Sequence, residues 1–300
     1  VGLCFGNLDP NFYDTTYAVY FNKKLADDNS IGNMYDLVYD GKWTLDRMGD
    51  MSASAYVDLN GNSEIDEGDR FGFVNQMWYA YLEAFNLESY HEGEDGNLSY
   101  VFDTDKYQKI IDSFHSMTFS NGGLFNENAV NIFSEGKALF TYQMLDCATT
   151  DFSQSDVQYG ILPMPKLDEN QSEYSVFCHD GSSLFALPST CRKADAASAV
   201  LEAMAAETYR TVTPAYFEIA LKTKYSRDDD TSRMLDIIVG SVKFDLAYIY
   251  GQELGTPIDR VRGILSSETE CQKGFSTLAS IETATLTKME KVMEKFDKLN

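Results

Sequence analysis

The sequence predicts an α/β fold, in which short buried strands alternate with amphipathic helices. Three observations support this class. Apolar runs with the length of strands recur along the chain, and longer stretches with helical spacing separate them. Hydrophobic residues make up 44% of the 300 residues and charged residues 24%, which is ordinary for a globular protein. No apolar run approaches the roughly 18 residues that a membrane-spanning helix needs.

Five segments are predicted as strands because they are short and rich in β-branched, aromatic and aliphatic residues. Proline ends two of them, at Pro163 and Pro188, as expected where a strand cannot continue its hydrogen bonding. The predicted strands cover residues 16–21, 71–74, 138–142, 157–161 and 183–187.

Helices are predicted between the strands from apolar residues spaced three and four apart. The clearest example follows Thr104, a possible N-cap. Its apolar stripe consists of Tyr107, Ile110, Ile111, Phe114 and Met117. Further helices are predicted at residues 22–28, after Thr44, and at 77–85, 127–135, 194–208, 232–241 and 272–299. The last one carries a stripe of Phe275, Leu278, Met289, Val292, Phe296 and Leu299.

The charge balance restricts the class of partner. The chain has 24 Lys and Arg against 47 Asp and Glu, which gives a formal net charge of −23. Such a surface repels phosphate backbones and anionic lipids, so nucleic acid is not expected as a partner. A neutral or cationic small molecule fits better. The 19 tyrosines suit a site that stacks rings against a ligand, although tyrosines also fill cores.

The five cysteines form no C-x-x-C pair, so no zinc or redox motif is visible. We expect small buried thiols, and one disulfide such as Cys178–Cys191 remains open.

Residues 58–69 match the pattern of a calcium-binding loop. Two positions depart from that pattern, since Ser63 replaces the usual glycine at position 6 and the last position holds an aspartate instead of a glutamate. A structural Ca²⁺ and a merely polar loop are therefore equally good interpretations. The candidate metal ligands are Asp58, Asn60, Asn62, Glu64, Asp66 and Asp69.

Six short motifs, in a fixed order, resemble those of one family across essentially the whole chain. The family is the extracellular solute-binding proteins of carbohydrate ABC transporters, of the maltose-binding type. The motifs are YFNKKL at residues 20–25, DGKWTL at 40–45, FSEGKALF at 133–140, YGILPMPK at 159–166, GSSLFALP at 181–188, and the helix at 193–208.

The resemblance implies a type II periplasmic-binding-protein fold, in which two α/β lobes close over a ligand. It also implies an N-terminal truncation, with one nearly complete lobe and part of the second. The nearly complete, C-terminal-type lobe is expected at residues 20–180 and 230–300. Residues 1–19 are expected to form the hinge strand region, and residues 181–229 a remnant of the N-terminal-type lobe.

The expected ligand site follows from the positions where relatives place ligand contacts. Asn75, Trp78 and Tyr79 are candidate ligand residues. Trp78 and Tyr79 could stack on a sugar ring, whereas the alternative for each is core packing. His179 and Asp180 stand before the returning strand and could hydrogen-bond a ligand or form a surface turn. Asp245 and Tyr248 are the remaining candidates.

The resemblance implies that the chain binds a small molecule, most readily a sugar, and passes it to ABC permease subunits without transforming it. It implies a monomer outside the cytoplasm, periplasmic or anchored as a lipoprotein, with no required cofactor. Two alternatives remain open: a glycoside hydrolase that uses two carboxylates, and a calcium-dependent interaction module. The chain has three histidines and shows no catalytic G-x-S-x-G or H-E-x-x-H motif.

Overall fold

The fold is known from a computed structural model of the chain, which confirms the α/β class. The structure describes residues 2–4, 9, 11–76, 81–87, 90–92, 98–120, 122–179, 183, 185–217, 228–243 and 250–297.

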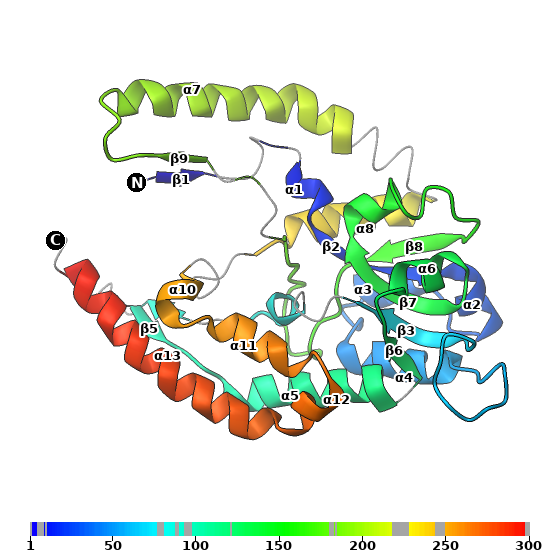
Figure 1. Ribbon diagram of the computed structural model, residues 1–300. Coiled ribbons are helices and arrows are strands. Elements are labelled where there is room, and N and C mark those ends of the chain that lie inside the picture. Colours follow the sequence, from blue (N-terminus) through cyan, green and yellow to red (C-terminus); the bar gives the residue numbers. More distant parts are fainter. Residues whose placement is uncertain are drawn as a thin grey trace.

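A five-stranded mixed sheet, in the order β6-β3-β7-β2-β8, forms the centre of the main lobe (Figure 1). β3 is parallel to β6 and β7, whereas β2 is antiparallel to both β7 and β8. All strands except β2 therefore run in one direction. The strands are β2 (Tyr17–Asn22), β3 (Phe71–Asn75), β6 (Gly123–Phe125), β7 (Ala138–Met144) and β8 (Tyr159–Leu162).

The sheet is covered on both faces, which explains why its strands read as apolar runs rather than as alternating ones. β2 shows the division most clearly. Tyr17, Val19 and Phe21 pack into the core on one face, and Ala18 and Tyr20 pack into the core on the other. Consecutive side chains of a strand point to opposite faces, so this one strand serves both cores.

Helices supply the two layers around the sheet. Those preceding α7 are α1 (Asn11–Asp14), α2 (Lys23–Asp28), α3 (Met34–Tyr39), α4 (Leu45–Ala55), α5 (Thr104–His115) and α6 (Ala129–Ser134). Those following α7 are α8 (Asp229–Gly240), α10 (Gly251–Leu254), α11 (Pro257–Ile264), α12 (Glu268–Gln272) and α13 (Gly274–Asp297). Short turns of 3-10 or π helix are η1 (Leu82–Phe85), η2 (Ser116–Ser120), η3 (Leu145–Ala148) and η4 (Thr208–Val212).

Local capping explains where the predicted helices begin. Thr44 caps α4 as predicted, because its hydroxyl accepts the backbone N–H of Arg47 at 3.4 Å. The cap of α5 is Asp103 rather than Thr104, since the Asp103 carboxylate accepts the N–H of Lys106 at 2.9 Å. A carboxylate is also the better group at a helix N-terminus, where the helix dipole is positive.

The long helix α13 corrects one prediction about the core. Leu278, Met289 and Val292 are buried as expected, but the side chain of Phe275 is 67% exposed. The buried stripe of this helix also runs through Ile281, and Phe275 falls to its side in the first turn. The side chains of Phe296 and Leu299 lie outside the described part of the chain.

A smaller part of the chain extends away from the main lobe (Figure 1). Here β1 (Gly2–Cys4) pairs with β9 (Phe185–Leu187), and α7 (Ala194–Glu207) packs against β9. No residue of α7 is buried, and Val200 and Met204 are 59% and 48% exposed. A two-stranded sheet with one helix is too small to enclose a core of its own. The chain thus holds one nearly complete lobe and part of a second, and the residue boundaries given above remain predictions.

The other described strands form a small hairpin, in which β4 (Tyr90–Glu92) pairs with β5 (Leu98–Tyr100). Cys178 and Cys191 are free thiols, as are Cys147 and Cys271, so the disulfide left open above is not formed. Among the described helices, none combines the length and the apolar character needed to cross a membrane.

A pair of phenylalanines tests this account of the core. Phe114 is 1% exposed, and its ring meets that of Tyr81 edge-on at 4.7 Å, whereas Phe275 is largely exposed. We expect Phe114→Ala to lower the free energy of unfolding by about 3–5 kcal/mol, because it leaves a cavity. Phe275→Ala should change it by less than about 0.5 kcal/mol. Urea unfolding of both variants measures the difference, and equal losses would contradict the assigned helix orientation.

Candidate functional site

Two of the predicted ligand residues, Asn75 and His179, lie at one edge of the sheet, and strand direction distinguishes this edge from the other. β3, β6, β7 and β8 all end there, and the antiparallel strand β2 begins there. We call this the carboxyl edge. In open α/β folds, ligands bind outside the carboxyl ends of the strands. The geometry therefore favours this edge over the opposite one.

Two segments that are distant in sequence run side by side at the carboxyl edge, joined through their backbones. Thr16 and Cys178 form an isolated antiparallel bridge. The N–H of Tyr17 donates to the carbonyl of Phe177 at 3.0 Å, and the N–H of His179 donates to the carbonyl of Thr15 at 2.8 Å. These bonds fix His179 relative to the start of β2.

A third segment continues this arrangement. The N–H of Val176 donates to the carbonyl of Ser241 at 2.9 Å, and the N–H of Lys243 donates to the carbonyl of Val176 at 3.2 Å. The end of α8 is therefore tied to the segment that leads to His179. The start of β2, the segment around Phe177 and the end of α8 therefore meet at the carboxyl edge. The first two are separated by some 160 residues in sequence, and the last two by some 65.

His179 is the predicted ligand residue that the structure places most informatively. It is partly exposed and lies at the carboxyl edge. Its imidazole centroid is 6.3 Å from the ring of Tyr17 and 6.5 Å from the ring of Phe177. The imidazole thus packs against the rings of Tyr17 and Phe177, which we call the aromatic wall, and is still partly accessible to solvent. A ligand-binding residue needs this combination of fixed position and access.

Asn75 also lies at the carboxyl edge, as the last residue of β3, but it has no exposed surface. Its carbonyl accepts the N–H of Asn126 at 2.9 Å, which joins the ends of β3 and β6. In this arrangement Asn75 supports the edge of the sheet. The other predicted ligand residues, Trp78, Tyr79, Asp180, Asp245 and Tyr248, lie outside the described residues.

The aromatic residues that pack against His179 were not predicted from the sequence. Tyr17 and Phe177 stack at 5.7 Å with 18° between their planes, and Tyr17 also packs against Tyr142. Arg262 of α11 lies over the Phe177 ring at 4.8 Å. These residues come from four separate segments, so no local spacing could have grouped them. The available signal was that Phe177 and His179 alternate with Cys178, which places them on the same side of an extended segment.

Burial of tyrosine hydroxyls in this cluster has an electrostatic consequence. Desolvation raises the pKa of Tyr81 well above its ordinary value, and the neighbouring Tyr142 and Tyr17 raise it further. The hydroxyl of Tyr81 therefore stays protonated and neutral at physiological pH. A neutral phenol can donate or accept a hydrogen bond, but it does not act as a base.

The loop at residues 58–69 is closed by its own side chains. The Asp58 carboxylate accepts the N–H groups of Gly61 and Ser63 at 2.6 and 2.9 Å. The buried Asp69 carboxylate accepts the N–H of Leu59 at 3.2 Å and the hydroxyl of Tyr56 at 3.0 Å. Burial and this bond to Asp69 raise the pKa of Tyr56 to about 12.

The other donors of the loop contact one another. The Asp66 carboxylate accepts the side-chain amides of Asn60 and Asn62 at 3.0 and 2.7 Å. The N–H of Gly68, and next the Asn62 amide, lower the pKa of Asp66. Glu64, by contrast, is an exposed residue. No group of three or more His, Cys, Asp or Glu side chains able to hold a metal occurs among the described residues, so Ca²⁺ here would depend on asparagine and backbone oxygens.

The loop also reaches the main sheet. The Glu67 carboxylate accepts the side-chain amides of Asn126 and Asn128 at 2.9 and 3.2 Å. Asn126 is the residue whose N–H bonds to Asn75. A change in the order of the loop would therefore change the contacts of Asn126 and Asn128, in the turn that follows β6.

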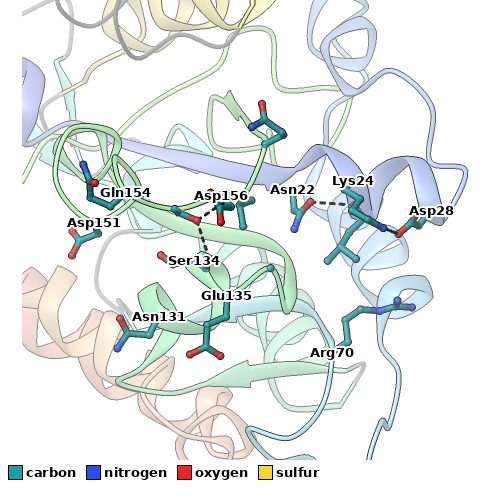
Figure 2. Close-up of a pocket in the computed structure, with 15 residues that line it drawn as sticks. Asn22, Lys24, Asp28, Arg70, Asn131, Ser134, Glu135, Asp151, Gln154 and Asp156 are labelled. Carbon is teal, nitrogen blue, oxygen red and sulfur yellow. Dashed lines mark hydrogen bonds and ion pairs between the residues drawn. The ribbon is translucent and has the colours of Figure 1, made fainter.

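A polar depression of about 910 Å³ lies at the opposite edge of the sheet (Figure 2). Asn22 at the end of β2, Gly136 before β7 and Gln158 before β8 line it. Its charged lining residues are Lys24, Asp28, Arg70, Glu135, Asp151 and Asp156.

Two of these carboxylates are paired with lysines. Lys24 lies 2.5 Å from Asp28, and Lys137 lies 2.8 Å from Glu135. No aromatic residue lines the depression, so it offers nothing for a sugar ring to stack on. Both its position and its chemistry distinguish it from the carboxyl edge.

The sequence matches no protein-family model and no curated protein sequence. The fold does match solved structures. One is UgpB from Mycobacterium tuberculosis in complex with glycerophosphocholine, with 11% identity, a TM-score of 0.58, and coverage of 93% of this chain and 70% of that one.

Two further structures are similar. The maltose/maltodextrin-binding domain MalE from Bdellovibrio bacteriovorus, bound to maltotriose, is 17% identical with a TM-score of 0.54, covering 96% of this chain and 76% of that one. An ABC transporter solute-binding protein from Agrobacterium vitis, with bound D-mannitol, is 15% identical with a TM-score of 0.55, covering 94% and 72%. The chain therefore has the type II periplasmic-binding-protein fold of these solute-binding proteins, with one lobe nearly complete and the second present in part.

Proposed function

We propose that this chain is the greater part of a solute-binding protein that presents a sugar or polyol to an ABC importer and leaves it chemically unchanged. The observation that carries the proposal is the structural match over more than nine-tenths of the chain to solute-binding proteins with bound maltotriose or D-mannitol. The carboxyl edge, with His179 partly exposed on an aromatic wall, supports it.

The charge of the chain favours a neutral ligand. A formal net charge of −23 disfavours the approach of anions, whereas it imposes no penalty on a polyhydroxyl compound. Aromatic faces contact the C–H surfaces of sugars, and polar side chains such as His179 hydrogen-bond to hydroxyl groups. The hydrolase alternative needs two carboxylates facing the bound glycoside. Among the described residues placed above at the carboxyl edge, Asn75, Tyr17, Phe177 and His179 offer amide, aromatic and imidazole groups.

The proposed function implies its partners and location. A permease in the membrane would receive the ligand, and the binding protein would act as a monomer on the extracellular or periplasmic side. A lipid anchor would keep the protein near the permease. The small negative surface potential of most membranes would repel so acidic a chain, which gives an anchor a physical purpose.

We further propose that the loop at residues 58–69 holds a structural Ca²⁺. Asp58, Asn60, Asn62, Asp66 and Asp69 supply oxygens at the spacing of a calcium loop. A cation would replace the amide contacts that Asp66 now accepts from Asn60 and Asn62. The contact of Glu67 with Asn126 and Asn128 supports a role in bracing the β6–α6 turn rather than in catalysis.

Calorimetric titration tests the main proposal. Maltotriose and D-mannitol should be titrated into the product of the complete reading frame and into the 300-residue chain. We expect micromolar or tighter binding to the former, and binding at least 100-fold weaker to the latter, because part of one lobe leaves the ligand exposed to water on one side. Absence of binding to both would contradict the proposal, and turnover of an aryl glycoside would favour the hydrolase.

The two tryptophans provide a matched pair of variants. Trp43 is fully buried, and its indole N–H donates to the carbonyl of Pro163 at 2.9 Å. We expect Trp43→Ala to lower the free energy of unfolding by about 3–5 kcal/mol without a specific loss of affinity. Trp78→Ala should weaken sugar binding at least about tenfold, or ~1.4 kcal/mol, with a smaller loss of stability. Calorimetry and thermal melts measure both, and the reverse outcome would assign Trp78 to the core.

The calcium proposal predicts a rise in melting temperature. At a Ca²⁺ concentration tenfold above the dissociation constant, we expect an increase of roughly 2–6 °C. Asp58→Ala should abolish this rise because it removes the first ligand of the loop. Asp50→Ala, which removes an exposed carboxylate from α4, should leave the rise intact. An unmutated chain whose melting curve ignores Ca²⁺ would show that the loop is only polar.

A further inference from the structure

Arg262 is an unusual charge for its position. It lies on α11 with only 3% of its surface exposed. Its guanidinium carbon is 4.8 Å from the centroid of the Phe177 ring, which is itself buried. A cation in that position is attracted by the negative face of the ring, and the attraction is stronger where water is excluded.

Packing alone does not account for an arginine at this site. Burying a guanidinium costs free energy that an apolar side chain of similar length would avoid. The contact with Asp259 is 3.4 Å long, and the Asp259 side chain is 58% exposed, so solvent screens this ion pair. An arginine places a planar cation against the Phe177 ring, which a methionine would not do.

Phe177 connects Arg262 to the carboxyl edge. Arg262 lies over its ring, which also stacks with Tyr17 at 5.7 Å and approaches the imidazole of His179 at 6.5 Å. The carbonyl of Phe177 accepts the N–H of Tyr17. A change in the orientation of the Phe177 ring would therefore alter the wall against which His179 rests.

We infer that Arg262 is a positioning residue for His179. Its guanidinium fixes the ring of Phe177, and the stacked pair of Phe177 and Tyr17 then sets the orientation of the His179 imidazole at the carboxyl edge. The consequence for ligand affinity rests on the proposed function, whereas the orientation of His179 does not.

The test uses two substitutions at Arg262 and one matched control. Arg262→Met keeps an unbranched apolar stem and removes the charged guanidinium, and Arg262→Lys keeps the charge and removes the plane. Arg260→Met is the control, because Arg260 stands two residues earlier on α11, is less buried, and contacts Ser280 at 3.5 Å. The chain has three histidines, so the imidazole resonances of His179 can be assigned by NMR with a His179→Asn variant.

Arg262→Met should stay folded and should move the His179 resonances toward those of an unstructured histidine, because the ring currents of Phe177 and Tyr17 change. Arg262→Lys should move them less, and Arg260→Met should leave them unchanged. Where the unmutated complete protein binds maltotriose or D-mannitol, Arg262→Met should weaken binding at least threefold.

Unchanged His179 resonances in Arg262→Met, or equal shifts in Arg260→Met, would overturn the inference. If Arg262→Met does not fold, Arg262→Lys takes its place. A shift of the His179 resonances in Arg262→Lys then supports the inference, and unchanged resonances overturn it. If the unmutated protein binds neither ligand, the proposed function fails, and the resonances still decide whether Arg262 positions His179.

Discussion

The antiparallel strand β2 is the element on which the rest of the structure depends. It lies between β7 and β8, and none of its residues is more than 4% exposed. Alternate side chains enter the two cores, so both helical layers pack against the same run of five residues, Tyr17 to Phe21. Its first residue, Tyr17, also begins the aromatic wall beneath His179. One strand thus joins the stability of the lobe to the geometry of its carboxyl edge.

Much of the fold could be predicted from the sequence because it depends on local periodicity. The strands at the centre of the sheet and the stripe of α5 follow from the spacing of apolar residues. The prediction failed where burial depends on distant partners. Phe275 was wrongly assigned to the apolar stripe of α13, because the buried stripe runs through Leu278 and Ile281 and Phe275 lies to one side of it.

The site was less predictable than the fold for the same reason. Asn75 and His179 were predicted as ligand residues from their positions next to strands, and both lie at the carboxyl edge, whereas their contact with a ligand stays a prediction. Tyr17, Phe177 and Arg262 come together only after the chain folds, across separations of about 160 and 85 residues. Side-chain stacking of that kind leaves no spacing pattern. The depression at the opposite edge shows the converse, since it is a sizeable pocket whose lining residues include no aromatic side chain.

The pairing of the segments around Thr16 and Cys178 has a consequence for evolution. The bonds that join them run between backbone N–H and carbonyl groups, which every residue except proline can supply. Substitution of the side chains therefore leaves this junction intact. The side chains at this place can therefore vary in sequence while the two segments stay joined.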